Sequence, residues 1–273
     1  MTATWNGWLP DGGLLEGKVA LVAGGAGGIG EATSRILAAA GATVAVVDRD
    51  AERANATAKE LTEAGGAALA VTADLFDEDA CNAAVDTTVA ELGGLDVLAN
   101  VAGGMSAHAP WAPITEWPTD TWDHITHLNQ RYVFWMCRAA IPAMVSGGKG
   151  GAIVNVTSIA GSFGSPGQSA YGAAKAGLLQ FTKTLAIECG PLGIRANAVA
   201  PGLTLTEPAA ALPEETKAQL ATLTPLRELC TPEDIARGIL VFASPITHGV
   251  TGQMIHVDAG ISVNFPYPGI GHQ

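Results

Sequence analysis

The chain has 273 residues and a formal net charge of −12 at pH 7; 48% of its residues are hydrophobic and 15% are charged. That much apolar material can fill the core of one large domain and excludes disorder as the main state. The acidic balance argues against nucleic acid or an anionic membrane as a partner, because both are bound through clustered lysine and arginine.

The N-terminus lacks the basic start and the apolar run of a signal peptide, so we expect a cytoplasmic protein with an N-terminal arm over residues 1–17. No apolar stretch reaches the roughly 20 residues that a membrane-spanning helix needs. The cysteines are scattered without a C-x-x-C pair, so we expect free thiols and no metal site. They are Cys81, Cys137, Cys189 and Cys230.

From Lys18 onward, short apolar strands alternate with helical segments. We expect strands at 19–23, 42–47, 67–72, 95–99, 151–157, 194–200 and 253–257. We expect helices at 31–40, 51–64, 78–92, 119–145 with a bend near Pro142, 170–188, 213–223 and 232–243. This alternation predicts an α/β fold: a doubly wound parallel sheet of about seven strands, flanked by helices on both faces. We expect one domain over 18–260, followed by a tail over 261–273.

A glycine-rich turn lies between the first strand and the first helix, where a dinucleotide pyrophosphate would bind to the N–H groups of the helix start. Gly25, Gly27 and Gly30 match G-x-G-x-x-G. Gly24, Gly28 and Gly30 match the wider spacing G-x-x-x-G-x-G. The sequence leaves open which set makes the close approach.

Asp48 ends the second strand, the position from which a carboxylate bonds the adenosine ribose. It would repel a 2′-phosphate by roughly 4 kcal/mol at about 4 Å and an intermediate dielectric, so we expect NAD in preference to NADP. Arg49 is the complication, since an arginine there can receive that phosphate. Asp50 fits better as the cap of the following helix.

Tyr171 and Lys175 stand four residues apart in the expected helix 170–188, so their side chains share a helical face. A free phenol has a pKa of about 10, and a nearby cation favours its deprotonated form. We therefore expect Lys175, helped by a bound cationic ring, to lower the pKa of Tyr171 and make it a proton carrier near neutral pH. Alone, this spacing is weak evidence, because many helices contain it.

With the glycine turn, Asp48 and the Tyr171/Lys175 pair in one chain, the sequence resembles the short-chain dehydrogenase/reductase family, of the compact single-domain type with a Rossmann-type fold. The likeness runs from about residue 18 to 260. Further matches follow in the expected order: Asp74-Leu75, Ala99–Gly103, Asn129, Val156–Ser158, Pro201–Thr204 and Val257–Gly260. Two departures are Val101, where the family has a second asparagine, and Ala23, where many members have threonine.

The resemblance implies that Tyr171 exchanges a proton with the substrate oxygen, which Ser158 holds by a hydrogen bond. It implies that Lys175 binds the nicotinamide ribose and that Asn129 holds a water linking Lys175 to solvent. The cofactor is expected to be NAD. Its predicted contacts, in chain order, are Gly24, Gly28, Ile29, Gly30, Asp48, Arg49, Asp74, Leu75, Asn100, Ala102, Gly103, Tyr171, Lys175, Pro201, Gly202 and Thr204.

Two unpatterned segments are expected to border the substrate, 104–117 and the lid-like 203–212. The predicted substrate contacts are Met105, His108, Trp111, Ser158 and Leu205. Neither segment offers an arginine cluster for a phosphate, coenzyme A or carrier protein, so we expect a small, fairly apolar secondary alcohol or ketone, open-chain or cyclic. Trp111 fits simple packing on the body equally well, and His108 fits a loop residue better than a second base.

The alternatives are an NADPH-dependent ketoacyl or quinone reductase, which Asp48 disfavours, and a non-catalytic NAD-binding sensor. The Ser158, Tyr171 and Lys175 set argues against the sensor, which would not need a proton relay. The family resemblance also implies a homotetramer formed through the helices at 119–145 and 170–188.

Overall fold

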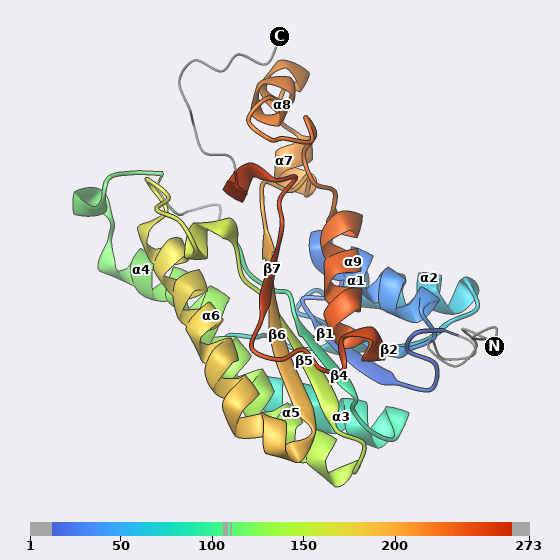
Figure 1. The fold of residues 1–273 in the computed structure, drawn as a ribbon. Coiled ribbons are helices and arrows are strands. Elements are labelled where there is room, and N and C mark those ends of the chain that lie inside the picture. The colour runs from blue at the N-terminus through green and yellow to red at the C-terminus, as the bar shows by residue number, and fades with distance from the viewer. Residues whose placement is uncertain (1–12, 106–108, 110, 264–273) are drawn as a thin grey trace, which may run out of the picture.

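The computed structural model describes residues 13–105, 109 and 111–263. Within them the strands are β1 (Val19–Ala23), β2 (Thr43–Asp48), β3 (Ala67–Thr72), β4 (Val97–Asn100), β5 (Gly151–Val156), β6 (Ile194–Pro201) and β7 (Met254–Val257). They form one sheet in the order β3-β2-β1-β4-β5-β6-β7 (Figure 1), and each neighbouring pair is parallel. The predicted doubly wound parallel sheet is confirmed.

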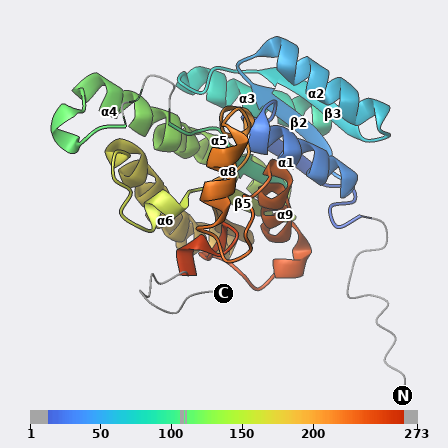
Figure 2. The ribbon, with the colours of Figure 1, turned by 90° about the horizontal axis from the view of Figure 1, so that it is seen from above.

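Helices cover both faces of this sheet. They are α1 (Gly28–Ala39), α2 (Ala51–Glu63), α3 (Glu78–Leu92), α4 (Thr119–Thr126), α5 (Tyr132–Ser146), α6 (Ser169–Cys189), α7 (Glu207–Ala210), α8 (Glu214–Ala221) and α9 (Pro232–Ala243). Figures 1 and 2 show α1, α2 and α9 on one face and α3 to α6 on the other. None of the described helices is both long and apolar enough to cross a bilayer.

The strands are apolar throughout because each buries both of its faces. In β1, Leu21 and Ala23 belong to the core under α3, α5 and α6, whereas Ala20 and Val22 belong to the core under α1, α2 and α9. A strand that alternates between two cores has no polar face, which explains the continuous hydrophobic runs of the sequence.

Local capping fixes where several helices begin and end. Asp50 caps α2 as predicted: its side chain accepts a hydrogen bond from the Arg53 N–H. Thr231 and Asp234 form a reciprocal capping box at the start of α9. Gly93 ends α3 in the left-handed conformation with φ +81°.

The long helix predicted over 119–145 is present, since the chain is helical without a break from Thr119 to Ser146. It is not uniform, however: a π-helical turn, His127–Arg131, lies between α4 and α5, and Pro142 lies inside α5. The reason for the π-helical turn lies at Asn129, whose side-chain amide donates to the Ile125 carbonyl at 2.9 Å and to the Gly104 carbonyl at 2.9 Å. An inserted side-chain donor disturbs the ordinary helical ladder and holds a π-bulge, a feature found mostly at functional sites.

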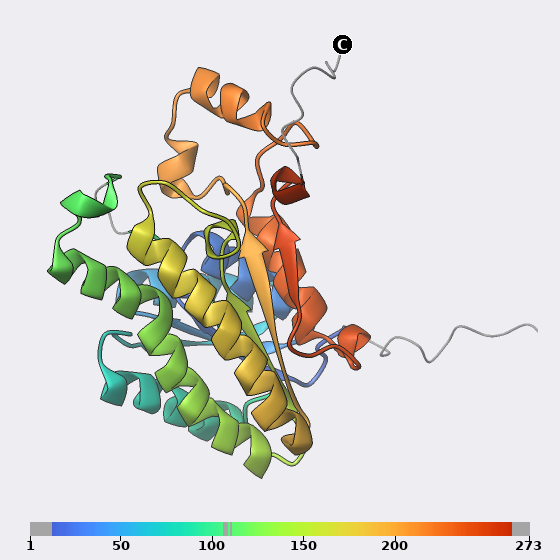
Figure 3. The same ribbon diagram turned by 60° about the vertical axis from the view of Figure 1, so that its left-hand side comes forward.

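The sheet order places a crevice at the carboxyl ends of β1 and β4. From β1 the chain moves outward through β2 and β3, then crosses to β4 on the other side of β1. Open parallel sheets bind ligands at such a switch point. Helices α7 and α8 lie beyond this edge of the sheet (Figure 1), while α6 runs beside the α4–π-helix–α5 segment (Figure 3).

Candidate active site

The glycine turn after β1 is shaped by contacts that only glycine permits. A Cβ on Gly30 would lie 1.7 Å from the Gly24 carbonyl oxygen, and one on Gly24 would lie 2.8 Å from Ala102 Cα. Gly24 and Gly28 have φ values of +80° and +50°. The turn is therefore packed against itself and against the loop after β4, and α1 begins directly at it, so the helix N-terminus that can bind an anion lies at this turn.

Asp48, at the carboxyl end of β2, joins this turn. Its carboxylate accepts hydrogen bonds from the Ala26 N–H at 3.2 Å and the Asp50 N–H at 3.1 Å. Each oxygen accepts one bond in the chain itself, so lone pairs remain for a ribose hydroxyl. Asp74 lies in the loop after β3, where it accepts from the Phe76 N–H at 3.0 Å, and Leu75 beside it is buried. The donors and acceptors present at this edge fit an adenosine ribose.

The loop after β4 supports the site mainly through its backbone. The Tyr132 hydroxyl donates to the Ala102 carbonyl at 2.7 Å. Asn100 is buried and donates to the Asn155 side-chain oxygen at 2.9 Å, so its side chain points into the core and not toward the crevice. Among the predicted cofactor contacts, Ala102 and Gly103 lie at the crevice, whereas Asn100 holds β4 to β5.

Four polar side chains come together beside this loop. Lys175 is 2% exposed, and its Nζ donates to the Val156 carbonyl at 2.8 Å. Its Nζ also lies 5.8 Å from the centre of the Tyr171 ring. Ser158, just after β5, accepts a hydrogen bond from the Ala160 N–H at 3.1 Å and lies close enough to Tyr171 to influence the pKa of its hydroxyl. Asn129 is buried and held by Gly104 from both sides: it accepts from the Gly104 N–H at 2.8 Å and donates to the Gly104 carbonyl.

Burial dominates the electrostatics of this cluster in the cofactor-free chain. Burial raises the pKa of Tyr171 above its usual value, and the nearby Ser158 side chain lowers it only in part. Burial also lowers the pKa of Lys175 to about 7. The prediction that Lys175, helped by a bound cationic ring, lowers the pKa of Tyr171 concerns the chain with its cofactor and stays a prediction. In the chain alone burial dominates both groups, and the desolvated amine stands over the ring face.

Gly103 is the point where two members of the cluster converge. A Cβ built on Gly103 would lie 2.6 Å from Asn129 Oδ1 and 3.1 Å from Lys175 Nζ, and its φ is +146°. We expect Gly103→Ala to displace both side chains and lower kcat/KM by about tenfold to a hundredfold, because small displacements at a reacting centre are costly.

The matched control is Gly104→Ala. Gly104 has a similarly strained φ of +129°, but its Cβ would meet nothing within 4 Å. Both variants are expected to lose roughly 1–3 kcal/mol of stability from backbone strain. Steady-state kinetics and thermal unfolding compare the two variants. Equal losses of kcat/KM would mean that backbone strain, and not displacement of Asn129 and Lys175, causes the loss in Gly103→Ala.

The mouth of the crevice is bordered by the segments expected to touch the substrate. Of the predicted substrate contacts, Met105 and Leu205 are partly buried, and Trp111 is 72% exposed, so its side chain does not pack against the body of this chain. A Cβ on Gly167 would lie 3.4 Å from the Trp111 backbone, which places this segment next to the loop before α6. The predicted contact His108 lies outside the described residues.

Two residues at the crevice were not predicted. Thr206 of the lid segment lies against the glycine turn, its methyl group 3.3 Å from the position of a Cβ on Gly28. The predicted Thr204 instead donates its hydroxyl to the Gly202 carbonyl at 3.1 Å within its own loop. The second is Arg53, whose guanidinium lies over Gly27. The contacts of Thr206 and Arg53 with the glycine turn could not be predicted from the spacing of residues along the chain, because both residues come from segments distant in sequence.

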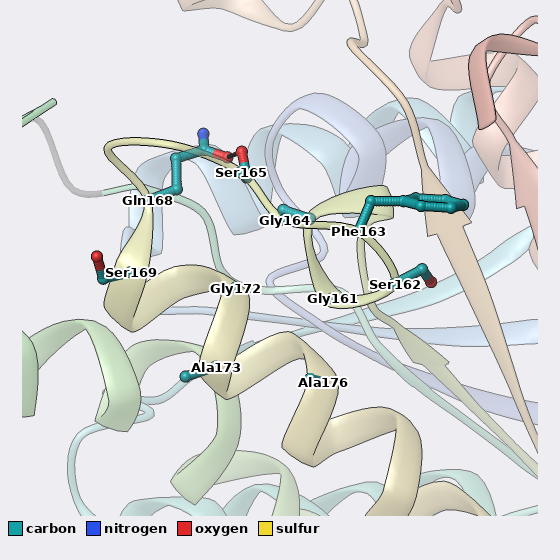
Figure 4. A pocket seen from close by; sticks show the side chains of 11 residues that line it. Gly161, Ser162, Phe163, Gly164, Ser165, Gln168, Ser169, Gly172, Ala173 and Ala176 are labelled. Atoms are coloured by element: carbon teal, nitrogen blue, oxygen red, sulfur yellow. Dashed lines mark hydrogen bonds between the residues drawn. The ribbon is translucent and has the colours of Figure 1, made fainter. Parts of the chain in front are cut away.

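A separate cavity of about 330 Å³ lies on another side of α6. Figure 4 shows the loop from Gly161 to Gln168 arching over the N-terminal turns of this helix. Its helical lining residues, Ser169, Gly172, Ala173 and Ala176, occupy a different helical face from Tyr171 and Lys175. Neither Ser158 nor Tyr171 lines this cavity, so we do not assign it to the reaction.

Within the described residues, no three His, Cys, Asp or Glu side chains gather as a metal site. All four cysteines are free and buried. Burial raises the pKa of the Cys81 thiol to about 12, and burial raises that of Cys230 to about 11, so neither is an activated nucleophile.

Comparisons with known proteins agree with this geometry. Residues 24–262 match the family model described as enoyl-(acyl carrier protein) reductase. The chain is 40% identical to cis-4-hydroxycyclohexanecarboxylate dehydrogenase of Sinomonas cyclohexanicum over 89% of this chain and 96% of that protein. It is 37% identical to a 3-oxoacyl-(acyl-carrier-protein) reductase of Thermotoga maritima over 91% and 99%. A solved 7α-hydroxysteroid dehydrogenase complexed with NADH and 7-oxo glycochenodeoxycholic acid superposes with a TM-score of 0.86 at 31% identity, covering 92% of this chain and 97% of that one.

Proposed function

The chain belongs to the short-chain dehydrogenase/reductase family and is an oxidoreductase of that family; from this we propose that it interconverts a secondary alcohol and a ketone with NAD(H). The observation that supports this most is the convergence of Ser158, Tyr171, Lys175 and Asn129 at the carboxyl edge of the sheet. Four groups of this kind beside a glycine turn fit paired hydride and proton transfer.

We propose that NAD, when bound, accepts or supplies the hydride, and that the chain's own side chains manage the proton. Tyr171 takes the hydroxyl proton of an alcohol, or returns a proton to the oxygen of a ketone. Ser158 donates a hydrogen bond to the substrate oxygen and stabilises the charge that develops on it. Lys175 and Asn129 lie behind Tyr171, where they pass the proton onward through a water to solvent.

The residues at the glycine turn and the end of β2 would hold the cofactor. Gly28 and the α1 N–H groups would receive the pyrophosphate, and Asp48 would accept from the adenosine ribose hydroxyls. The free lone pairs of this carboxylate support NAD over NADP, because a second negative group there would be repelled. We expect a lower Michaelis constant for NADH than for NADPH.

The mouth of the crevice supports a small, uncharged substrate. In the described part of 104–117 and 203–212, the charged side chains are Glu116 and Glu207, both acidic. An acyl carrier or coenzyme A group would need cations for its phosphate. Two curated relatives act, by their names, on a hydroxycyclohexanecarboxylate, which is an anion, and on a hydroxysteroid, so they support a ring in the substrate but not the absence of charge. These features together favour a cyclic alcohol or ketone over a carrier-bound acyl chain.

The test is an assay of NADH and NADPH oxidation over a panel of cyclic and open-chain ketones and one acetoacetyl thioester. We expect turnover with NADH and at least one cyclic ketone, and a preference for that ketone over the thioester. A chain that binds NADH but reduces none of the panel would favour the sensor alternative; a preference for NADPH and the thioester would favour the ketoacyl reductase.

We also propose a homotetramer. Phe134 on α5 and Ile187 on α6 are 44% and 78% exposed, and large apolar side chains on neighbouring helices are typical of an interface. Light scattering after size-exclusion chromatography measures the mass directly.

A further inference from the structure

A cluster of stacked rings lies on the side of the sheet covered by α3 and α5, apart from the groups assigned to the reaction. The Phe76 ring stacks on His127, with ring centres 4.4 Å apart and planes inclined by 26°, and on His124 at 4.8 Å and 23°. Trp135 of α5 meets the His127 ring edge-on at 5.1 Å. Stacked and edge-to-face ring pairs at such distances attract each other beyond the effect of their buried area. The rings therefore hold three segments of the chain together.

Phe76 belongs to the first of these segments, the loop after β3. We call residues 73–77 the adenosine loop, because Asp74 and Leu75 are predicted cofactor contacts at the edge that fits an adenosine ribose. The Phe76 N–H donates to the Asp74 side chain at 3.0 Å, and the Asp77 N–H donates to the Asp74 carbonyl at 3.0 Å. A contact that holds the Phe76 ring therefore also fixes this loop.

His127 belongs to the second segment and is the first residue of the π-helical turn His127–Arg131. Two residues later in that turn, Asn129 accepts from the Gly104 N–H and donates to the Gly104 carbonyl. Asn129 is the residue proposed to hold the water of the proton relay. The ring stack thus joins the adenosine loop, at one end of the crevice, to the relay at the other.

The His127 imidazole is placed so that it remains neutral. Its Nε2 is closed off from solvent and has no hydrogen-bond partner in the part of the chain that the structure describes. A protonated imidazole carries an N–H on both nitrogens, so protonation would put a charge and an unpaired donor at this buried atom. Burial is the largest cause that lowers the pKa of His127, followed by the charge of Arg131.

The charged groups around this ring come from each segment packed against it. Arg131 and His124, on its own helical segment, disfavour the protonated form, and Asp74 of the adenosine loop favours it only in part. On α5, Arg138 is already paired with Glu78 of α3. Among the described residues the imidazole belongs to no ion pair, so no carboxylate there would compensate a charge on it.

We propose that His127 is a positioning residue, which ties the adenosine loop to the turn of Asn129 through its stack with Phe76. The neutral imidazole holds the two segments together. A proton on Nε2 drives the ring out of the stack and loosens both segments, so adenosine binding and the relay weaken together in acid. The inference rests on the proposed use of a nicotinamide dinucleotide and adds a link between the two ends of its site.

The first measurement is the dissociation constant of adenosine for the full chain at pH 8 and pH 5.5, by NMR titration. Adenosine is uncharged at both pH values and has no nicotinamide ribose to contact Lys175. In the natural chain we expect its affinity to fall about fivefold or more toward pH 5.5, a typical coupling between linked sites. His127→Leu keeps apolar volume but cannot take up a proton, so its affinity should change by less than about twofold.

His124→Leu is the matched control. It removes the exposed imidazole that stacks on the same Phe76 ring, three residues earlier on the helix. We expect this variant to keep the acid loss of adenosine affinity that the natural chain shows. At pH 5.5 His127→Leu should then bind adenosine more tightly than both the natural chain and His124→Leu.

The second measurement is kcat at saturating NADH with a ketone that the chain reduces. Titration of Tyr171 and Lys175 is common to all the proteins, so the ratio of the natural kcat to the variant kcat isolates the replaced histidine. We expect this ratio to fall about threefold or more from pH 8 to pH 5.5 for His127→Leu, and to stay within about twofold for His124→Leu. A purely structural role would change kcat by the same factor at both pH values.

Phe76→Leu serves if His127→Leu does not fold, because it removes the stack and keeps the imidazole. It should weaken adenosine binding at pH 8 by about twofold to tenfold, the worth of one stacked pair. It should also remove most of the further loss at pH 5.5, since the proton then has no stack to break.

The proposal is overturned if adenosine affinity in the natural chain does not change with pH, if the acid loss persists in His127→Leu or Phe76→Leu, if it disappears equally in His124→Leu, or if the kcat ratio for His127→Leu stays constant. Each of these results leaves cofactor binding and turnover intact. A natural chain that binds neither adenosine nor NADH would instead contradict the proposed function.

Discussion

Tyr171→Phe is expected to lower kcat by roughly 10²- to 10⁴-fold while the dissociation constant for NADH stays almost unchanged, because general acid–base catalysis contributes about that much. The change removes one oxygen and keeps the ring, so the packing of α6 is preserved. Without that oxygen, the substrate hydroxyl loses the group that exchanges its proton, and Ser158 loses a neighbouring hydroxyl. Stopped-flow hydride transfer and titration of NADH fluorescence measure the two quantities.

Tyr132→Phe provides the comparison for stability. It removes the hydroxyl that donates to the Ala102 carbonyl at 2.7 Å, deep in the core behind the crevice. That loss leaves a buried acceptor unpaired, at a cost of about 1–3 kcal/mol, but takes away no proton carrier. We expect Tyr132→Phe to lower the melting temperature more than Tyr171→Phe does, and kcat far less. Near-natural turnover in Tyr171→Phe would contradict the proposed role of Tyr171 in proton exchange with the substrate.

The fold was predictable because its signals are local or strictly periodic. The predicted bounds of α3, 78–92, and of α9, 232–243, agree with the structure. Apolar runs bounded by glycine gave each strand to within a few residues, and the cap at Asp50 followed from its place before an apolar period. Because connections between parallel strands through a helix are almost always right-handed, the alternation of strands and helices then predicts a doubly wound sheet.

The irregular segment around Asn129 could not be read in this way. Its sequence has the helical periodicity of its neighbours, and the interruption comes from a side-chain amide that bonds the Ile125 and Gly104 carbonyls. One of those partners lies far along the chain, in the loop after β4. Pro142, by contrast, is a strong local signal for a bend, and it lies inside α5, which does not end there.

The protonation of Tyr171 and Lys175 also depends on how deeply they are buried, which cannot be deduced from their spacing in the sequence. The four-residue interval between Tyr171 and Lys175 places both on one face, but it cannot tell that Lys175 is 2% exposed. A desolvated amine gives up its proton more readily and so stabilises a phenolate less. In the same way, Thr206 and Arg53 reach the glycine turn across space, and no residue count along the chain connects them to it.

Lys175→Met is the second substitution expected to have a large effect, and it acts on both turnover and stability. Loss of the amine removes the group behind Tyr171 in the proposed relay, so we expect kcat to fall by about 10²-fold or more. The methionine also leaves the Val156 carbonyl without the donor that lies at 2.8 Å in the natural chain. Activity alone would therefore not distinguish a relay from a structural contact.

The pH dependence of stability gives that second readout. Burial lowers the pKa of Lys175 from 10.5 to about 7 in the folded, cofactor-free chain. Between pH 7 and about 10 the unfolded chain binds a proton here that the folded chain does not, so this residue makes the free energy of unfolding rise with pH, by up to about 1.4 kcal/mol per unit. Below pH 7 both states hold the proton and the full cost of burial remains; above about 10 both are neutral and the cost is gone.

Urea unfolding without NAD at pH 7, 8 and 9 tests this directly. The rise should disappear in Lys175→Met and persist in Lys183→Met, which removes an exposed amine from the same helix. Equal slopes in all three proteins would mean that Lys175 keeps its proton in the folded chain, as an ordinary ammonium bound to Val156. A slope lost only in Lys175→Met would show that the folded site releases this proton near neutral pH, which is what a relay from Tyr171 to solvent requires.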